Sequence, residues 1–448
     1  MDRLIQFALL VALTLAVPKP AWAQGSISGH SRPVSLQAAI DAALTRNSDL
    51  AIAEARRDVA RSQTRNATGS LLPRIDVQAG YIRSVDPVVA FGTKLRQGRF
   101  SEPDLAFDVL NDPDPVGDWS TVVGVQWSLL DPTRWAGRSA ARRQAEAADW
   151  STERTREATI LMTRTHYLQA QAAAAQLEAA DAALEASQAM LDQFRRRRDR
   201  GLLTEADLLG AVAELSAARA DRAEADRARL DAFQLLGRHL GWSPDTVPEP
   251  VDSLAAPADM AAVEFEPAAR ADLRARAAAA RAAGAAKRQA ALAFVPALDA
   301  FAQYATHSTD AFSFDEADWT VGVMLRWNLF NGFARSADLQ RANLERRIAD
   351  LEYEQALRDA LSERDQVERS VGSARQQVEA TGAGATAAES GRQLMRRRFE
   401  EGLATAADLL QAEARATAMR QRAINALANY HIAVARLDFV QSQINAEK

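Results

Sequence analysis

The sequence of 448 residues contains no cysteine, which excludes disulfides, thiolate metal sites, cysteine nucleophiles and a lipid-carrying N-terminal cysteine. Aromatic residues make up only 6%, and alanine supplies much of the apolar fraction, so long, closely packed helices are favoured over a large globular core. Basic residues are not in excess either. The formal net charge is −5, which argues against a nucleic-acid partner.

Catalytic motifs are also missing. The five histidines are scattered without metal-ligand spacing, and the chain has neither a Walker phosphate-binding loop nor a GxSxG nucleophile elbow. An acidic, proline-rich stretch at 84–118 lacks the glycine and glutamate of an EF-hand calcium loop. We therefore expect no enzymatic activity, no cofactor and no metal.

The N-terminus is typical of an export signal. Arg3 precedes an apolar run from Leu4 to Val17, and Ala21-Trp22-Ala23 has the small-x-small spacing of a cleavage site. Residues 1–23 are therefore interpreted as a signal peptide, because the run is too short for a membrane anchor. No later stretch approaches about 18 uninterrupted apolar residues, so the exported chain would enter a membrane only as strands.

The rest of the chain is an internal repeat. Asp49 and Pro73 recur as Asp272 and Pro296, 223 positions later, whereas the stretch 119–129 recurs 200 positions later. The difference places 23 extra residues between the two strand-like runs of the first copy. We assign 24–241 to the first copy, 242–267 to a proline-containing linker, 268–440 to the second copy and 441–448 to a tail.

Each copy contains two runs in which apolar and polar residues alternate, as in strands with one apolar and one polar face. The runs cover 74–83, 119–129, 297–305 and 319–329. Two tryptophans stand eight residues apart on the apolar face of the second run in each copy, or about 26 Å along a strand. The apolar band of an outer-membrane barrel is about 25 Å tall and has aromatic girdles. The expected girdle residues are Trp119, Trp127, Trp319, Trp327, Tyr81 and Tyr304.

A soluble β-sandwich with these tryptophans in its core is the alternative. If the strands do cross a membrane, four of them cannot close a barrel, because membrane barrels start at about 8 strands. An open edge would leave backbone groups unpaired in lipid. The chain must then oligomerise, and two copies would give about 8 strands with a filled interior, whereas three would give about 12 and room for a pore.

Long helices follow each pair of strands. The stretch 134–200 has no proline and would extend about 100 Å as a helix. Leucines recur every seven residues within it, as in a coiled-coil seam. A second helix returns over 205–236, and the second copy repeats the pattern over 334–398 and 406–437.

These features together resemble the TolC-like outer-membrane efflux proteins, most specifically through the repeated Gly-Leu-x-x-x-x-Asp-Leu-Leu stretch at 201–209 and 402–410. The resemblance implies an α+β membrane protein with long α-helical coiled-coil hairpins and four β-strands per chain. In a homotrimer these strands would complete a 12-stranded transmembrane barrel. It also implies an exit duct that conducts substrates passively from the periplasm to the exterior in a tripartite efflux or type I secretion system. Implied partners are a periplasmic adaptor, an inner-membrane pump and the lipid of the outer membrane.

The resemblance also assigns residues to a periplasmic aperture. Asp408 aligns with the first aspartate of the ring that narrows the aperture, and Asp207 is its partner in the first copy. The family pattern has a second aspartate where this chain has Gln411 and a latch arginine where it has Ala404, while a latch aromatic falls at Phe399. From the residues alone, both aspartates are equally well explained as helix caps.

The turns Gly201-Leu202 and Gly402-Leu403 match the places where family members meet the adaptor. A plain turn with the leucine packed inward is the alternative, because glycine often ends helices. The stretch 84–118 would form a loop that faces the exterior, where barrel loops are longer.

Two other classes of protein remain open. A periplasmic coiled-coil adaptor, or a structural protein without a channel, would fit the four strand-like runs poorly. A general porin would need many more strands per chain and few long helices. The arginine runs Arg195–Arg198 and Arg396–Arg398 lie just before the tip glycines, so they suit solvated helix ends better than nucleic-acid contacts.

Overall fold

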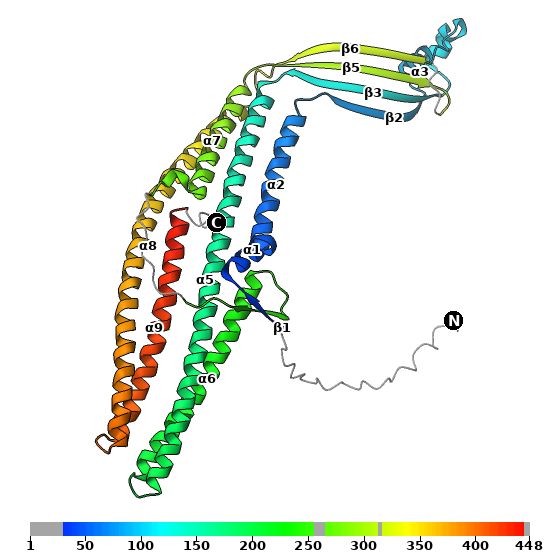
Figure 1. Ribbon diagram of the computed structural model, residues 1–448. Coiled ribbons are helices and arrows are strands. Elements are labelled where there is room, and N and C mark those ends of the chain that lie inside the picture. Colours follow the sequence, from blue (N-terminus) through cyan, green and yellow to red (C-terminus); the bar gives the residue numbers. More distant parts are fainter. Residues whose placement is uncertain (1–29, 255–264, 312–315, 443–448) are drawn as a thin grey trace, which may run out of the picture.

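The computed structural model describes residues 30–254, 265–311 and 316–442, so the expected signal peptide and most of the expected tail lie outside the described residues. The described chain is elongated, with long helices that carry a four-stranded sheet at one end (Figure 1). Within this part of the chain, no helix combines the length and the apolar character needed to cross a bilayer.

Four long helices form two hairpins. They are α5 (Pro132–Arg198), α6 (Glu205–His239), α8 (Ala334–Glu400) and α9 (Ala406–Val440). At 67 residues each, α5 and α8 extend about 100 Å. The returning helices end later than the predicted 236 and 437, because Leu240 and Val440 are fully buried in the clusters around their ends.

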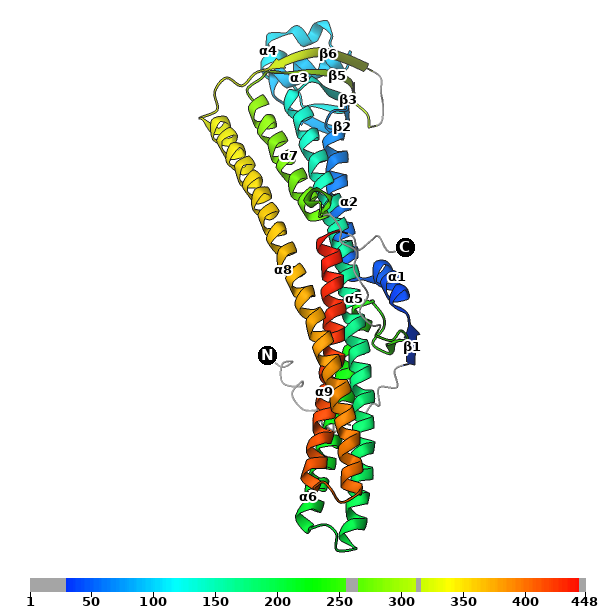
Figure 2. The ribbon, with the colours of Figure 1, turned by 60° about the vertical axis from the view of Figure 1, so that its left-hand side comes forward.

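Shorter helices complete the upper half of the molecule. There α2 (Ser48–Gly69) packs on α5, α5 on α7 (Ala271–Leu292), and α7 on α8, which gives a layer in the order α2, α5, α7, α8 (Figure 2). A short 3-10 turn, η2 (Pro267–Ala269), precedes α7. The outer helices α2 and α8 therefore lie on opposite flanks of the layer.

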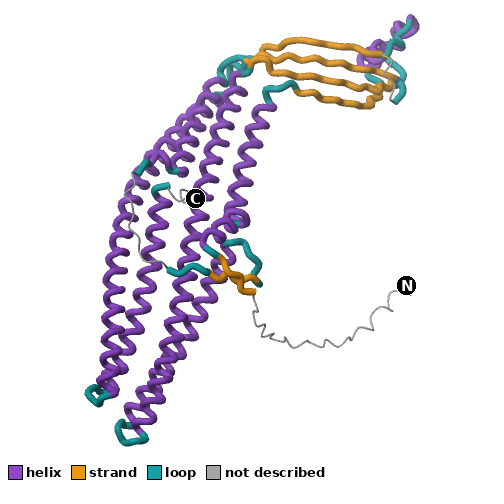
Figure 3. Tube along the Cα trace, viewed as in Figure 1, coloured by secondary structure: helices purple, strands orange, loops and turns teal. Residues whose placement is uncertain are grey.

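The sheet follows the same order. It is antiparallel and contains β2 (Arg74–Ser84), β3 (Val116–Leu130), β5 (Ala297–Ser308) and β6 (Glu316–Arg326), with β2 and β6 at its edges (Figure 3). The fourth strand begins and ends three residues earlier than the predicted 319–329, so Trp327 lies beyond its end. The indole N–H of Trp327 donates instead to the carbonyl of Phe294 (3.1 Å).

One face of this sheet is apolar and exposed. Directly opposed residues of an antiparallel pair share a face, and the registers Tyr81↔Trp119 and Tyr304↔Trp319 place these aromatic side chains together on that face. Its large apolar side chains are 40–71% exposed: Ile75, Val77, Tyr81, Trp119, Trp127, Tyr304, Trp319, Val321, Val323 and Leu325. The opposite face carries polar residues, such as Gln78, Gln126, Gln303 and Thr320.

A small parallel sheet, unpredicted from the sequence, holds the start of the linker. Strand β1 (His30–Val34), just before α1 (Leu36–Arg46), pairs with β4 (Thr246–Pro250). The buried Tyr167 hydroxyl lies within hydrogen-bond distance of two acceptors, the Val34 carbonyl (2.9 Å) and the Asp252 carboxylate (2.7 Å). These contacts fasten both segments to the middle of α5.

The stretch 84–118 is more ordered than the predicted loop. It contains α3 (Pro87–Arg96), the 3-10 turn η1 (Glu102–Leu105) and α4 (Phe107–Asn111). Asp86 caps α3, which begins at a proline as helices often do. The Lys94 ammonium lies 2.7 Å from Asp104 and, with hydrogen bonds from Ser101, lowers the pKa of Asp104 to about 2. Some of the aspartates that suggested a loop instead cap a helix or form an ion pair.

Candidate functional site

The two hairpin tips have the same backbone geometry. Gly201 and Gly402 adopt left-handed φ values of 75° and 79°, which favour glycine. The next N–H in each turn, from Leu202 or Leu403, donates to the carbonyl five residues earlier, as in a Schellman motif. The two leucine side chains are 67% and 65% exposed, so the inward-packed alternative does not describe these turns.

Both tip aspartates cap the returning helices. Asp207 accepts hydrogen bonds from the N–H (3.0 Å) and hydroxyl (2.6 Å) of Thr204, and Asp408 does the same with Thr405 (3.0 and 2.7 Å). Each threonine hydroxyl accepts in return from the aspartate N–H, which completes a capping box. The capping interpretation is thus confirmed, and both Thr405 bonds go to one oxygen of Asp408, Oδ2.

Of the other residues at positions assigned to the aperture, one is exposed and two are packed in the core of the tip. Gln411 is exposed one turn beyond Asp408, whereas Ala404 packs against the tip core. Phe399 is only 2% exposed, and its ring centroid lies 5.2 Å from that of Phe194. In the single chain Phe399 therefore packs inside the tip.

Arg197 joins the two tips, a role that sequence reasoning missed. Its guanidinium donates to the carbonyls of Phe399 (2.8 Å) and Glu400 (2.7 Å), which belong to the last turn of α8. The same group lies over the Phe399 ring at 4.5 Å. The last carbonyls of a helix lack hydrogen-bond partners within that helix. Arg197, which belongs to α5, supplies hydrogen bonds to two such carbonyls at the end of α8. It lies in an arginine run that was interpreted as a solvated helix end, and no local signal distinguishes it from its neighbours.

The capping of α9 should depend on pH. The hydrogen bonds from the Thr405 hydroxyl and N–H lower the pKa of Asp408 below its ordinary value. The carboxylate therefore contributes stability that is present above the unfolded pKa, about 3.9, and is lost as the pH falls through the folded pKa. We expect the protection of amide hydrogens in the first turn of α9, measured relative to the intrinsic exchange rate at each pH, to fall on acidification and, at neutral pH, in Asp408→Ala. The exposed Gln411→Ala should leave it unchanged, and unchanged protection in Asp408→Ala would contradict the cap.

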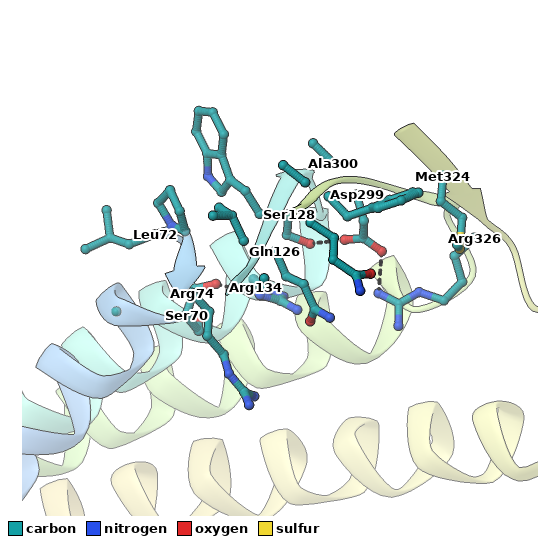
Figure 4. A pocket seen from close by; sticks show the side chains of 18 of the residues that line it. Ser70, Leu72, Arg74, Gln126, Ser128, Arg134, Asp299, Ala300, Met324 and Arg326 are labelled. Atoms are coloured by element: carbon teal, nitrogen blue, oxygen red, sulfur yellow. Dashed lines mark hydrogen bonds and ion pairs between the residues drawn. The ribbon is translucent and has the colours of Figure 1, made fainter. Parts of the chain in front are cut away.

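A polar pocket of about 940 Å³ lies where the sheet meets the helices (Figure 4). Asp299 lines this pocket, where it accepts a hydrogen bond from the Ser128 hydroxyl (2.5 Å) and pairs with Arg326 (2.9 Å). Arg74 also lines the pocket and pairs with Asp76 at 2.8 Å. These side chains lie on the polar face of the sheet. The pocket is therefore on the side of the sheet opposite the exposed apolar side chains.

The same junction is built twice. Trp127 donates from its indole N–H to the Leu71 carbonyl (3.1 Å), as Trp327 does to Phe294 in the second copy. Arg134 donates to the Ser70 carbonyl (2.6 Å), and Arg335 likewise to Ala293 (3.1 Å). The ends of α2 and α7 are thus capped by a tryptophan and an arginine from the following segment. The two membrane-interface tryptophans expected here also hold the junction together.

Comparisons with known proteins agree with this architecture. A family model described as outer membrane efflux protein matches residues 39–241 and 267–440. Among solved structures, a membrane protein from Pseudomonas aeruginosa is similar with a TM-score of 0.78, 21% identity and coverage of 91% of this chain and 92% of that chain.

Two further structures are similar over the same share of this chain, 91%. The outer membrane protein VceC from Vibrio cholerae has a TM-score of 0.75 and 20% identity over 95% of its chain. The Campylobacter jejuni CmeC outer membrane channel has a TM-score of 0.78 and 16% identity over 85% of its chain. No curated protein sequence matches. Because the family model covers both copies of the repeat, the chain belongs to the outer membrane efflux protein family.

Proposed function

We propose that this protein is the outer-membrane channel of a tripartite efflux or type I secretion system and conducts substrates passively from the periplasm to the exterior. The observation that carries the proposal is the sheet. On one face large apolar side chains are exposed, the other face carries mainly polar residues, and within the described residues neither edge strand has a partner on its outer side. Contact with lipid would cover the apolar side chains of the first face, and a water-filled channel would solvate the polar side chains of the second.

The edges require further copies of the chain. In lipid, the unpaired N–H and C=O groups of β2 and β6 need partners, because each unsatisfied group costs several kcal/mol. Pairing of the β2 edge of one copy with the β6 edge of the next closes a ring, and three copies give a 12-stranded barrel with an open lumen.

The helices support the same arrangement. On the α2 flank, Ile52 and Val59 are 48% and 58% exposed, one heptad apart. On the α8 flank, Leu344, Ile348 and Leu351 are 51–55% exposed at helical spacing. These two apolar stripes lie on opposite flanks of one layer, so successive copies can bury them against one another in a head-to-tail ring.

The tips form the periplasmic end in this proposal. Exposed Leu202 and Leu403 would contact a periplasmic adaptor, which links the duct to an inner-membrane pump. Three copies of Asp408 and Gln411 around the axis would narrow the aperture, and the ring of carboxylates would favour cations. Phe399, being buried, would act by holding the tip together.

The remaining assignments follow from the sequence. Residues 1–23 would direct export and be removed, and the chain would not be lipidated because it has no cysteine. The two repeats would have the bounds given above, with the six girdle aromatics at the lipid interfaces. The protein would be no enzyme, and the energy for transport would come from the pump.

Electron microscopy of the detergent-purified mature protein tests the proposal. We expect a threefold particle well over about 100 Å long, given the length of α5 and α8, with a barrel at one end. In planar bilayers the protein should conduct ions with a cation preference, which Asp408→Ala should weaken. Thr405→Ala is the matched control, since it removes the hydroxyl of the same capping box and keeps the Asp408 carboxylate. A particle without threefold symmetry, or one that does not conduct, would overturn the channel. An equal change in both variants would overturn the aperture role of Asp408.

A further inference from the structure

The segment 86–112 covers the end of the sheet away from the long helices (Figure 1). Its first helix, α3, contacts both β3 and β6, so the segment reaches across the sheet and beyond the two strands that it connects. Only the first copy of the repeat carries it, because it contains the 23 extra residues of that copy.

Gln97, just after α3, fastens the segment to the sheet. Its amide NH2 group lies within hydrogen-bond distance of three acceptors, the Gly117 carbonyl (2.9 Å), the Asp118 carboxylate (2.8 Å) and the Ser308 carbonyl (3.1 Å), which share its two hydrogens. Its amide oxygen accepts two hydrogen bonds from Arg99 (3.0 and 2.7 Å). One side chain therefore connects the segment to β3 and β5 at once.

The sheet side of this contact is the polar face. His307 lies opposite Ser120 and Glu316 in the strand registers, and its Nδ1 lies 2.8 Å from Asp118. Gln97, Asp118 and His307 are 6%, 7% and 7% exposed, although Gln78, Gln303 and Thr320 further along the same face are exposed. The segment is what shields this end of the polar face.

The segment is itself a folded unit with an apolar outer surface. Phe91 packs edge-to-face on Phe100 with ring centroids 4.8 Å apart, and the Lys94–Asp104 pair joins α3 to η1. Val88 and Phe107, however, are 80% and 83% exposed. Large apolar side chains so exposed on an ordered segment mark a surface for contact with another molecule.

We propose that segment 86–112 is a lid that closes the outer mouth of the channel, held by Gln97 on the Asp118–His307 pair. The inference rests on the proposed channel, in which the polar face lines the lumen. Three lids, one from each copy, would meet across the lumen and bury Val88 and Phe107 against one another. Release of Gln97 would open the mouth without any change in the barrel.

Cysteine labelling tests the lid, because the chain has no cysteine of its own. Ser120→Cys places a thiol on the polar face opposite His307. We expect a large polyethylene-glycol maleimide, added outside intact cells, to label Ser120→Cys slowly, and several-fold faster when Gln97→Ala is added. Arg96→Ala, an exposed neighbour on α3, is the matched control and should leave labelling slow. A second variant replaces 87–112 with a short glycine–serine linker and should label at least as fast as Gln97→Ala.

Equal labelling rates in the parent, Gln97→Ala and the linker variant would overturn the lid. Acceleration by Arg96→Ala to the same extent would also overturn the role of Gln97. The linker variant decides the question if Gln97→Ala does not assemble. Ion conduction by the linker variant, which has no lid, is measured in planar bilayers in parallel. Conduction with unchanged labelling rejects the lid alone, whereas absence of conduction rejects the channel itself.

Discussion

Val323→Arg should largely abolish assembly of the protein in the outer membrane. Val323 lies on the apolar face midway between Trp319 and Trp327 and is 63% exposed in the single chain. An arginine on the lipid face at the bilayer midplane costs about 2–4 kcal/mol, and three copies would bring the cost to about 6–12 kcal/mol per trimer. The measurement is the fraction of chain recovered as trimer from the outer-membrane fraction.

Thr320→Arg is the matched control for this prediction. Thr320 lies three residues away on the same strand but on the polar face, opposite Gln303. A charge there would face water in the lumen, so assembly should be close to that of the unmodified chain. If Thr320→Arg were as harmful as Val323→Arg, the two faces of the sheet would not differ in environment, and the membrane assignment would be wrong.

Phe399→Ala should destabilise the hairpin tips by about 3–5 kcal/mol, the usual cost of deleting a fully buried phenylalanine. Phe399 contributes to a cluster drawn from all four long helices, in which Phe194, Leu208 and Leu409 are also buried. The deletion removes the ring contact with Phe194 and the platform beneath Arg197. Limited proteolysis of the purified protein should show cleavage at the tips at much lower protease concentration.

Leu403→Ala is the control for the tip. It lies four residues further along the chain and is 65% exposed, so its truncation should change stability by no more than about 0.5 kcal/mol. The same variant should weaken adaptor binding under the proposed function. Equal proteolysis of the two variants would show that the Phe399 cluster does not hold the tips together.

Several elements could be predicted because their signals are local. Alternation of period two is visible within ten residues, and the expected runs 74–83, 119–129 and 297–305 all lie within observed strands. Glycine followed by leucine at each tip indicates a reversal because only glycine adopts the required φ without strain. The family resemblance, which combined these local signals with the repeat, is confirmed by the family model.

Other features could not be predicted because they depend on partners far apart in the chain. Arg197 binds carbonyls about 200 positions away, β1 pairs with β4 across more than 200 positions, and Gln97 reaches Ser308. Each of these residues looks ordinary in its local sequence. The helices within 84–118 were missed because aspartate and proline favour both loops and helix starts.

The sequence by itself determined the repeat, the long helices, the two-faced strands and the turns at the tips, since each follows from periodicity or from the conformational limits of single residues. Only the tertiary structure decided that Phe399 is buried, that Asp207 and Asp408 cap their helices, and that Gln97 holds a folded segment on the polar face. The physical reason is that burial and hydrogen bonding depend on which distant segments come into contact. A local sequence pattern carries information only about residues that are close together along the chain.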